Sequence, residues 1–170
     1  VRSAVANGKL KAHLDVQVAD IYIICVPTPF HTDAGIPRPN VDYVIEAAES
    51  ISPHVKGGDI VILESTSPVG TTELIRDILK KNGADTSAII IVYCPERVLP
   101  GHVIQEIVAN DRIIGGMTRA CSNLAVDLYS ILVEGKCHIT NARTAEMTKL
   151  TENSCRDVQI AFANELSIIC

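Results

Sequence analysis

The feature that most constrains the fold of this chain is a series of short, continuously apolar runs rich in β-branched residues. They lie at 20–26 (DIYIICV), 59–63 (DIVIL), 88–93 (AIIIVY) and 112–115 (RIIG). Continuous hydrophobicity is typical of strands covered on both faces, as in parallel sheets. Helical patterns at 41–55 and 71–82 separate the first three runs, so the order predicts βαβ units and a parallel α/β sheet.

The end of the chain has a different pattern, because positions 143–170 contain neither Gly nor Pro. One helix of that length spans roughly 42 Å at about 1.5 Å per residue, which exceeds a compact α/β layer and suggests a bridge between domains. We therefore expect a boundary between Thr140 and Thr144. One helix face carries polar side chains three or four residues apart, and spacing alone favours a solvated face. These side chains are Glu146, Lys149, Asn153 and Asp157.

Smaller elements are expected around this framework. The helix at 71–82 should begin with Thr71 as its N-cap and end in two lysines, an order that suits the helix dipole. A further helix is expected at 122–132 and a strand at 136–140. Positions 1–19 are ambiguous and are interpreted as a helix end and a short edge strand.

Composition and charge narrow the class of protein. With 47% hydrophobic and 21% charged residues, the chain resembles a soluble globular protein. A net charge of −5 disfavours DNA or an anionic membrane as a partner, and an aromatic content of 4% without Trp disfavours base stacking. The absence of a signal peptide and of membrane-length apolar runs favours a cytoplasmic location.

The six cysteines form no C-x-x-C motif and have no metal-ligand spacing with the histidines. We therefore expect no metal site and reduced, structural thiols. Cys25 and Cys94 fall inside apolar runs, where a buried thiol behaves as a small hydrophobic group.

Three of the expected strands end in loops that could form a binding site, since ligands of open parallel sheets lie beyond the carboxyl ends of the strands. These loops carry prolines, small hydroxyls and Glu96, and Gly70 precedes a helix N-terminus that could accept a phosphate or carboxylate. Ordinary turn chemistry explains any one loop, but three neighbouring loops favour a site. The residues do not name its ligand, because G-x-G-x-x-G, G-x-x-x-x-G-K-[ST] and G-x-S-x-G are all absent.

Several strings nonetheless occur together in a familiar order: CVPTPF (25–30), ILESTSPVGTT (62–72), YCPERVLPG (93–101) and the stretch 143–170. Together they resemble the UDP-glucose/GDP-mannose dehydrogenase family over nearly the whole chain. PERVLPG, NDRIIGGM (110–117) and TAEMTKLTENS (144–154) are similar to its UDP-N-acetyl-D-mannosamine branch.

The resemblance implies the later part of a Rossmann-like NAD-binding domain at 1–142 and the start of a central helical dimerisation domain at 143–170. It places a Gly-rich loop and an acidic ribose-binding residue before Val1, and a catalytic cysteine after Cys170. Cys170 itself does not match the motif of that nucleophile. A homodimer is implied, as is inactivity of these 170 residues alone.

The resemblance also implies the reaction: the C6 alcohol of a UDP-sugar is oxidised to a carboxylate in two NAD-linked steps, through a cysteine adduct. By motif position, Val26, Thr28, Ser65 and Thr66 resemble residues near NAD. Thr66 also resembles a threonine near the catalytic water.

Three more residues match catalytic positions of the family. Glu96 resembles a carboxylate that assists water or proton transfer. Lys149 and Asn153 resemble the pair that positions the substrate and stabilises its oxyanion. Related UDP-glucose enzymes carry a second carboxylate where this chain has Pro100, so the task of that carboxylate stays unassigned.

Two alternatives remain open at this stage. A UDP-glucose or GDP-mannose 6-dehydrogenase shares the chemistry but changes the sugar, and only PERVLPG speaks against it. A non-catalytic dinucleotide-binding or dimerisation module is the second alternative. Flanking G-x-G-x-x-G and G-G-x-C motifs would distinguish the enzyme from such a module.

Overall fold

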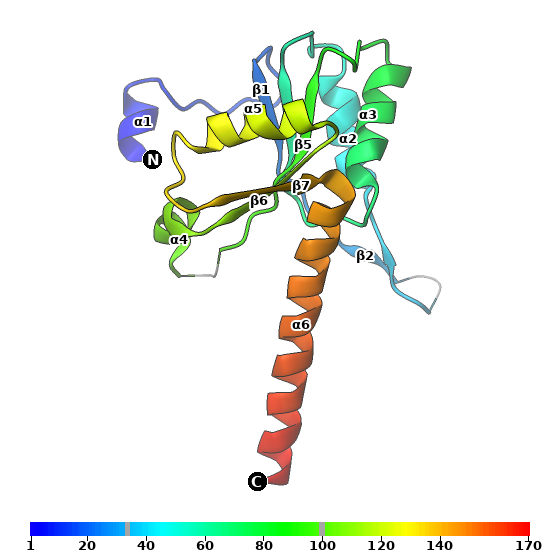
Figure 1. The fold of residues 1–170 in the computed structure, drawn as a ribbon, viewed down its shortest axis with the longest axis vertical. Helices are drawn as coiled ribbons and strands as arrows, with labels where there is room; N and C mark the ends of the chain where they lie inside the picture. Colours follow the sequence, from blue (N-terminus) through cyan, green and yellow to red (C-terminus); the bar gives the residue numbers. More distant parts are fainter. Residues whose placement is uncertain (33–34, 99–100) are drawn as a thin grey trace.

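The computed structural model describes residues 1–32, 35–98 and 101–170. Its main feature is a five-stranded sheet with the spatial order β1-β4-β5-β6-β7 (Figure 1). The strands are β1 (Ile21–Ile24), β4 (Ile60–Leu63), β5 (Ile90–Tyr93), β6 (Arg112–Gly116) and β7 (Cys137–Asn141). The four apolar runs and the strand expected at 136–140 are therefore all present as strands.

Strand direction agrees with the sequence everywhere except at β6. β1, β4 and β5 run parallel, and so do β6 and β7, whereas β5 and β6 are antiparallel. The fold is thus α/β with a mainly parallel sheet. The apolar run at 112–115, whose continuous hydrophobicity suggested a parallel strand like the first three, instead pairs antiparallel with β5. The described part of the connection from β5 to β6 holds the seven-residue α4 (Val103–Ala109), and an antiparallel neighbour needs no helix to cross the sheet.

Helices cover both faces of the sheet. On one face α2 (Asp42–Ile51) and α3 (Thr71–Lys81) enclose a core cluster that includes Val44, Ile75 and Tyr93. On the other face α5 (Arg119–Tyr129) packs on β5, β6 and β7. These helices agree with the expected 41–55, 71–82 and 122–132 apart from their ends.

β1 is covered on one face only, which corrects the expectation of burial on both. Tyr22 and Ile24 are buried against α2, but Ile21 and Ile23 are 37% and 52% exposed. The reason is that β1 is the edge strand. The helix on the second face, α5, packs on β5, β6 and β7, away from β1.

Small elements complete the described residues. Positions 1–19 contain α1 (Arg2–Ala6) but none of the edge strand expected there. A hairpin of β2 (Phe30–His31) and β3 (Arg38–Pro39), like α4, was not expected from the sequence.

The expected long helix is present as α6 (Ala142–Ile169), and Figure 1 shows it leaving the body of the fold. The Asn141 side chain caps it by accepting a hydrogen bond from the Thr144 amide at 2.9 Å. Its first turns cross β6 at Gly115, where an added Cβ would lie 2.5 Å from the Asn141 carbonyl oxygen. The missing side chain of Gly115 therefore lets α6 lie against the sheet.

Candidate active site

The loops after β1 and β4 are joined by hydroxyl groups. Ser65, only 8% exposed, accepts from the Val26 amide at 2.8 Å and donates to the Val26 carbonyl at 2.8 Å. The Thr28 hydroxyl donates to the Thr66 carbonyl at 2.6 Å. The four residues expected near a cofactor therefore lie together at the carboxyl edge of the sheet.

These contacts separate two kinds of residue. The Ser65 hydroxyl is already committed to Val26, so it shapes the edge and is not a donor aimed at a ligand. The side chains of Thr28 and Thr66 are half-buried at that edge. An edge of this kind fits an extended ligand lying across the ends of parallel strands.

The loop after β5 meets α6 through Lys149. The Lys149 Nζ donates to the Glu96 carbonyl at 2.7 Å, and the Glu96 carboxylate accepts from the Val98 amide. Since β1, β4 and β5 are parallel neighbours, Glu96 leaves the sheet at the same edge as Thr28 and Thr66. Residues far apart in the chain are thus gathered at one end of the sheet.

The Lys149 side chain is half-buried. Burial lowers the pKa of its amine, and the carboxylates of Glu96 and Glu152 oppose that shift. Asn153 lies one turn further along α6 and is exposed. Because residues four apart share a helix face, both side chains are available to the same neighbouring group.

Glu146 begins the same polar row but is fully buried, with 0% exposure. Its carboxylate accepts from Gly70 N at 2.6 Å, Thr72 N at 2.8 Å and Thr72 Oγ1 at 2.6 Å. The N-cap of α3 is Gly70, with φ of 101°, and not Thr71 as expected. The anion at this helix N-terminus is thus the protein's own Glu146, which leaves no phosphate site there.

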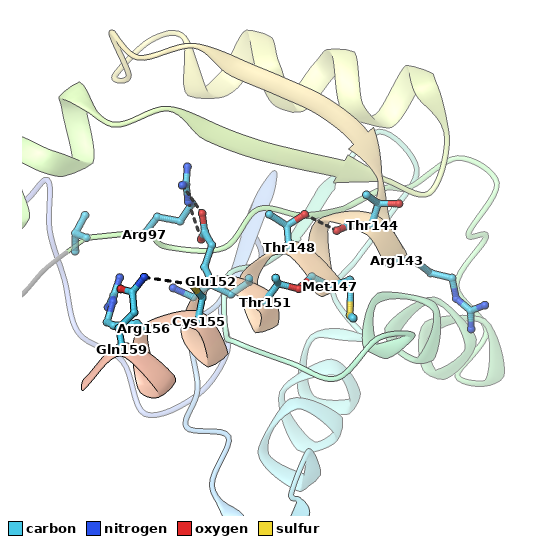
Figure 2. A pocket seen from close by; sticks show the side chains of 12 residues that line it. Arg97, Arg143, Thr144, Met147, Thr148, Thr151, Glu152, Cys155, Arg156 and Gln159 are labelled. Carbon is cyan, nitrogen blue, oxygen red and sulfur yellow. Dashed lines mark hydrogen bonds and ion pairs between the residues drawn. The ribbon is translucent and has the colours of Figure 1, made fainter. Parts of the chain in front are cut away.

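An ion pair next to these residues was missed in the sequence. Arg97 donates to both carboxylate oxygens of Glu152, with a distance of 3.0 Å from Nε to Oε2 (Figure 2). The pair borders an open groove of about 760 Å³ lined by α6 side chains and the 97–98 loop. Nothing in the sequence pattern pairs residues 55 positions apart, although both adjoin candidate catalytic residues.

The cysteines are all free, and two of them, Cys25 and Cys94, directly follow strands at the candidate edge. Cys94 is buried as expected, and burial raises its pKa to about 12. Cys25 is exposed, contrary to expectation, because it directly follows the edge strand β1, which is covered on one face only. Desolvation and the neighbouring Glu64 raise its pKa to about 11, so neither thiol is primed as a nucleophile.

Comparison with known proteins assigns the whole arrangement to one family. Residues 1–133 match the NAD binding domain of the UDP-glucose/GDP-mannose dehydrogenase family, and residues 143–170 match its central domain. The chain belongs to this family.

Named relatives of this dehydrogenase family agree with that result. The chain is 55% identical over 179 aligned positions to a UDP-N-acetyl-D-mannosamine dehydrogenase of Campylobacter jejuni, covering 100% of this chain and 44% of the relative. It is 52% identical to an NDP-N-acetyl-D-galactosaminuronic acid dehydrogenase of Ralstonia solanacearum, covering 100% of this chain and 42% of that protein. The chain therefore spans less than half the length of these curated relatives.

A solved structure gives the same picture of the dehydrogenase fold. The UDP-N-acetyl-mannosamine dehydrogenase of Staphylococcus aureus superposes with a TM-score of 0.87 at 42% identity, covering 99% of this chain and 41% of that one. Val26, Thr28, Ser65, Thr66 and Glu96 thus fall in the family's NAD-binding domain, and Lys149 and Asn153 fall in its central domain.

The described residues offer neither a metal cluster nor a membrane-spanning helix. Within residues 1–32, 35–98 and 101–170, no three His, Cys, Asp or Glu side chains are grouped so as to hold a metal ion. No helix in that part of the chain has both the length and the hydrophobicity needed to cross a membrane. Pro100, where related enzymes carry a second carboxylate, lies outside the described residues.

Proposed function

We propose that this chain is the later part of the NAD-binding domain (1–142) and the start of the central helix (143–170) of an NAD-dependent UDP-sugar 6-dehydrogenase. The observation that carries the proposal is the contact of Lys149 on α6 with the Glu96 main chain at 2.7 Å. It joins the family's central-domain helix to the strand-end edge of its NAD domain, so candidate cofactor and substrate residues meet.

Each residue has a task in this proposal. Val26, Thr28 and Thr66 present the edge on which NAD would lie, with Ser65 holding their two loops together. NAD supplies the acceptor for the hydride. Lys149 and Asn153 donate hydrogen bonds to the oxygen of the reacting carbon as negative charge develops there.

Glu96 is placed to assist proton or water transfer in the same scheme. Its carboxylate is half-buried and accepts one amide hydrogen bond, which leaves acceptor capacity for a water molecule. A general base of this kind typically contributes about 10²–10⁴-fold to the rate. The catalytic water would lie between Glu96 and Thr66.

For the substrate, we propose UDP-N-acetyl-D-mannosamine, oxidised to UDP-N-acetyl-D-mannosaminuronate. PERVLPG, NDRIIGGM and the 55% identical Campylobacter jejuni relative support this sugar. The Ralstonia solanacearum relative, at 52% identity, supports an N-acetyl-D-galactosamine nucleotide as the second candidate.

We also propose a cytoplasmic homodimer. Free cysteines at all six positions suit a reducing compartment. The second half of α6 exposes large apolar side chains, including Phe162 at 64% and Ile168 at 77%. Exposed apolar surface of that extent is stabilised by a partner.

The test uses the complete protein, meaning the longest natural polypeptide that contains these 170 residues. NADH formation should be followed with UDP-N-acetyl-mannosamine, UDP-N-acetyl-galactosamine, UDP-glucose and GDP-mannose at equal concentration. We expect the first sugar to give the highest kcat/KM, with two NADH per uronate. The isolated 170 residues should stay at background. Absence of NADH with every sugar would contradict the enzyme proposal and favour a non-catalytic module.

A further inference from the structure

The ion pair of Arg97 and Glu152 connects the two segments that carry the candidate catalytic groups. Arg97 directly follows Glu96 in the loop after β5. Glu152 lies on α6, three residues after Lys149 and next to Asn153. Figure 2 shows the guanidinium of Arg97 facing the Glu152 carboxylate across the space between loop and helix.

The geometry of this pair is more restrictive than attraction between charges. Arg97 Nε and Nη2 bind separate oxygens of Glu152, and Nη1 donates to the Asp111 carbonyl at 3.0 Å. A planar guanidinium that is held at three nitrogens fixes both the direction and the separation of its partners. The side chains are 28% and 33% exposed, so water screens the pair less than a surface ion pair.

The loop depends on contacts of this kind for its position. Val98 is bonded locally to Glu96, and Lys149 is bonded to the Glu96 carbonyl. Neither Glu96 nor Arg97 belongs to the two buried apolar clusters of the described residues. Polar tethers to α6 and Asp111 therefore set where the Glu96 carboxylate lies relative to Lys149.

We infer that Arg97 and Glu152 form a positioning pair, which sets the distance between Glu96 and the Lys149–Asn153 face of α6. The inference rests on the proposed function. It adds two residues whose role is to hold the catalytic groups in register and not to contact the reacting atoms. Misplacement of a reacting group by about 1 Å can cost 10²-fold in rate. The two-nitrogen contact of Arg97 with Glu152 therefore affects turnover.

The central experiment is Arg97→Lys in the complete protein. This substitution keeps the positive charge and removes the guanidinium that donates to both oxygens of Glu152. We expect kcat to fall about 10- to 100-fold while KM for NAD and the melting temperature stay close to wild type. Glu152→Gln should give a similar loss, and the double variant should lose no more than either single one. Wild-type kcat in Arg97→Lys, or fully additive losses, would overturn the inference.

A matched control is Arg76→Lys, which alters an exposed ion pair with Asp77 on α3. This pair does not join separate elements, so kcat should be unchanged.

A second readout does not depend on turnover. Hydrogen exchange of the Val98 amide should accelerate in Arg97→Lys, whereas exchange of the Val26 amide, held by Ser65, should stay the same. If the wild-type protein oxidises none of the sugars, the proposed function fails, and exchange at Val98 still decides the positioning role. Unchanged exchange at Val98 overturns it.

Discussion

Glu146 on α6 binds Thr72 on α3 twice, since one carboxylate oxygen lies 2.8 Å from the Thr72 amide and 2.6 Å from its hydroxyl. The other oxygen binds the Gly70 amide at 2.6 Å. A fully buried carboxylate is thereby stabilised by the amides of a helix N-terminus. The contact fixes the first turns of α6 against the loop that follows β4.

We expect Glu146→Ala to destabilise the fold by about 1.5–3 kcal/mol, because it leaves buried amide donors without the charged acceptor. Glu146→Gln should cost less, since the amide oxygen still accepts from one donor. Urea unfolding monitored by circular dichroism measures both. The control is Glu165→Ala at an exposed position of α6, where a change within about 0.5 kcal/mol is expected. Equal stability of Glu146→Ala and Glu165→Ala would show that the buried contact contributes nothing.

Ser65→Ala distinguishes two roles of the Ser65 hydroxyl, which either joins the loops after β1 and β4 or contacts the cofactor directly. Losing the hydroxyl removes its hydrogen bonds to the Val26 backbone, so we expect a loss of stability of about 0.5–1.5 kcal/mol. KM for NAD should rise only to the extent that the two loops separate. A variant that keeps wild-type stability and loses NAD affinity would instead make Ser65 a direct ligand, as its motif position suggested.

Much of the fold followed from local patterns in the sequence. The apolar runs predicted four strands of the sheet, a fifth was expected at 136–140, and the absence of Gly and Pro predicted α6. Periodicity could not give the direction of β6, because that depends on whether the 94–111 connection crosses the sheet. It also could not show that the far face of β1 lacks a covering helix.

The candidate site shows the same division. Loops after β1, β4 and β5 were correctly expected at one edge, since parallel strands place their carboxyl ends together. The polar row of α6 looked uniform in sequence, yet Glu146 is buried, Lys149 half-buried and Asn153 exposed. Only the partners of each residue, which come from distant segments, separate these environments.

The Asp111 carboxylate should contribute to stability in a pH-dependent way. The carboxylate accepts hydrogen bonds from His138 at 2.8 Å and from the Lys136 amide at 2.8 Å. These bonds, the one from His138 most, hold the pKa of Asp111 below the usual value. A lowered carboxyl pKa stabilises the fold above the unfolded pKa of about 3.9, and this contribution is lost as the pH falls through the folded pKa. Asp111→Asn should therefore lie below wild type in melting temperature at pH 7, and the difference should begin to shrink as the pH falls below about 4. A constant difference across that range would contradict this linkage.

Lys149→Ala in the complete protein tests the catalytic use of α6 most directly. Loss of one oxyanion donor typically costs about 10²–10³-fold in kcat, or roughly 2.7–4 kcal/mol. The fold should tolerate the change, because burial lowers the pKa of Lys149. The charged amine of such a lysine lowers the free energy of unfolding, and this destabilisation is relieved only as the pH rises toward the unfolded pKa near 10.4.

Steady-state kinetics together with thermal melting separates the effect of Lys149→Ala on catalysis from its effect on stability. Lys11→Ala, at an exposed position, is the matched control. If Lys149→Ala folds well and keeps a kcat near that of Lys11→Ala, the amine is only a tether to the Glu96 carbonyl, and the oxyanion role passes to another group.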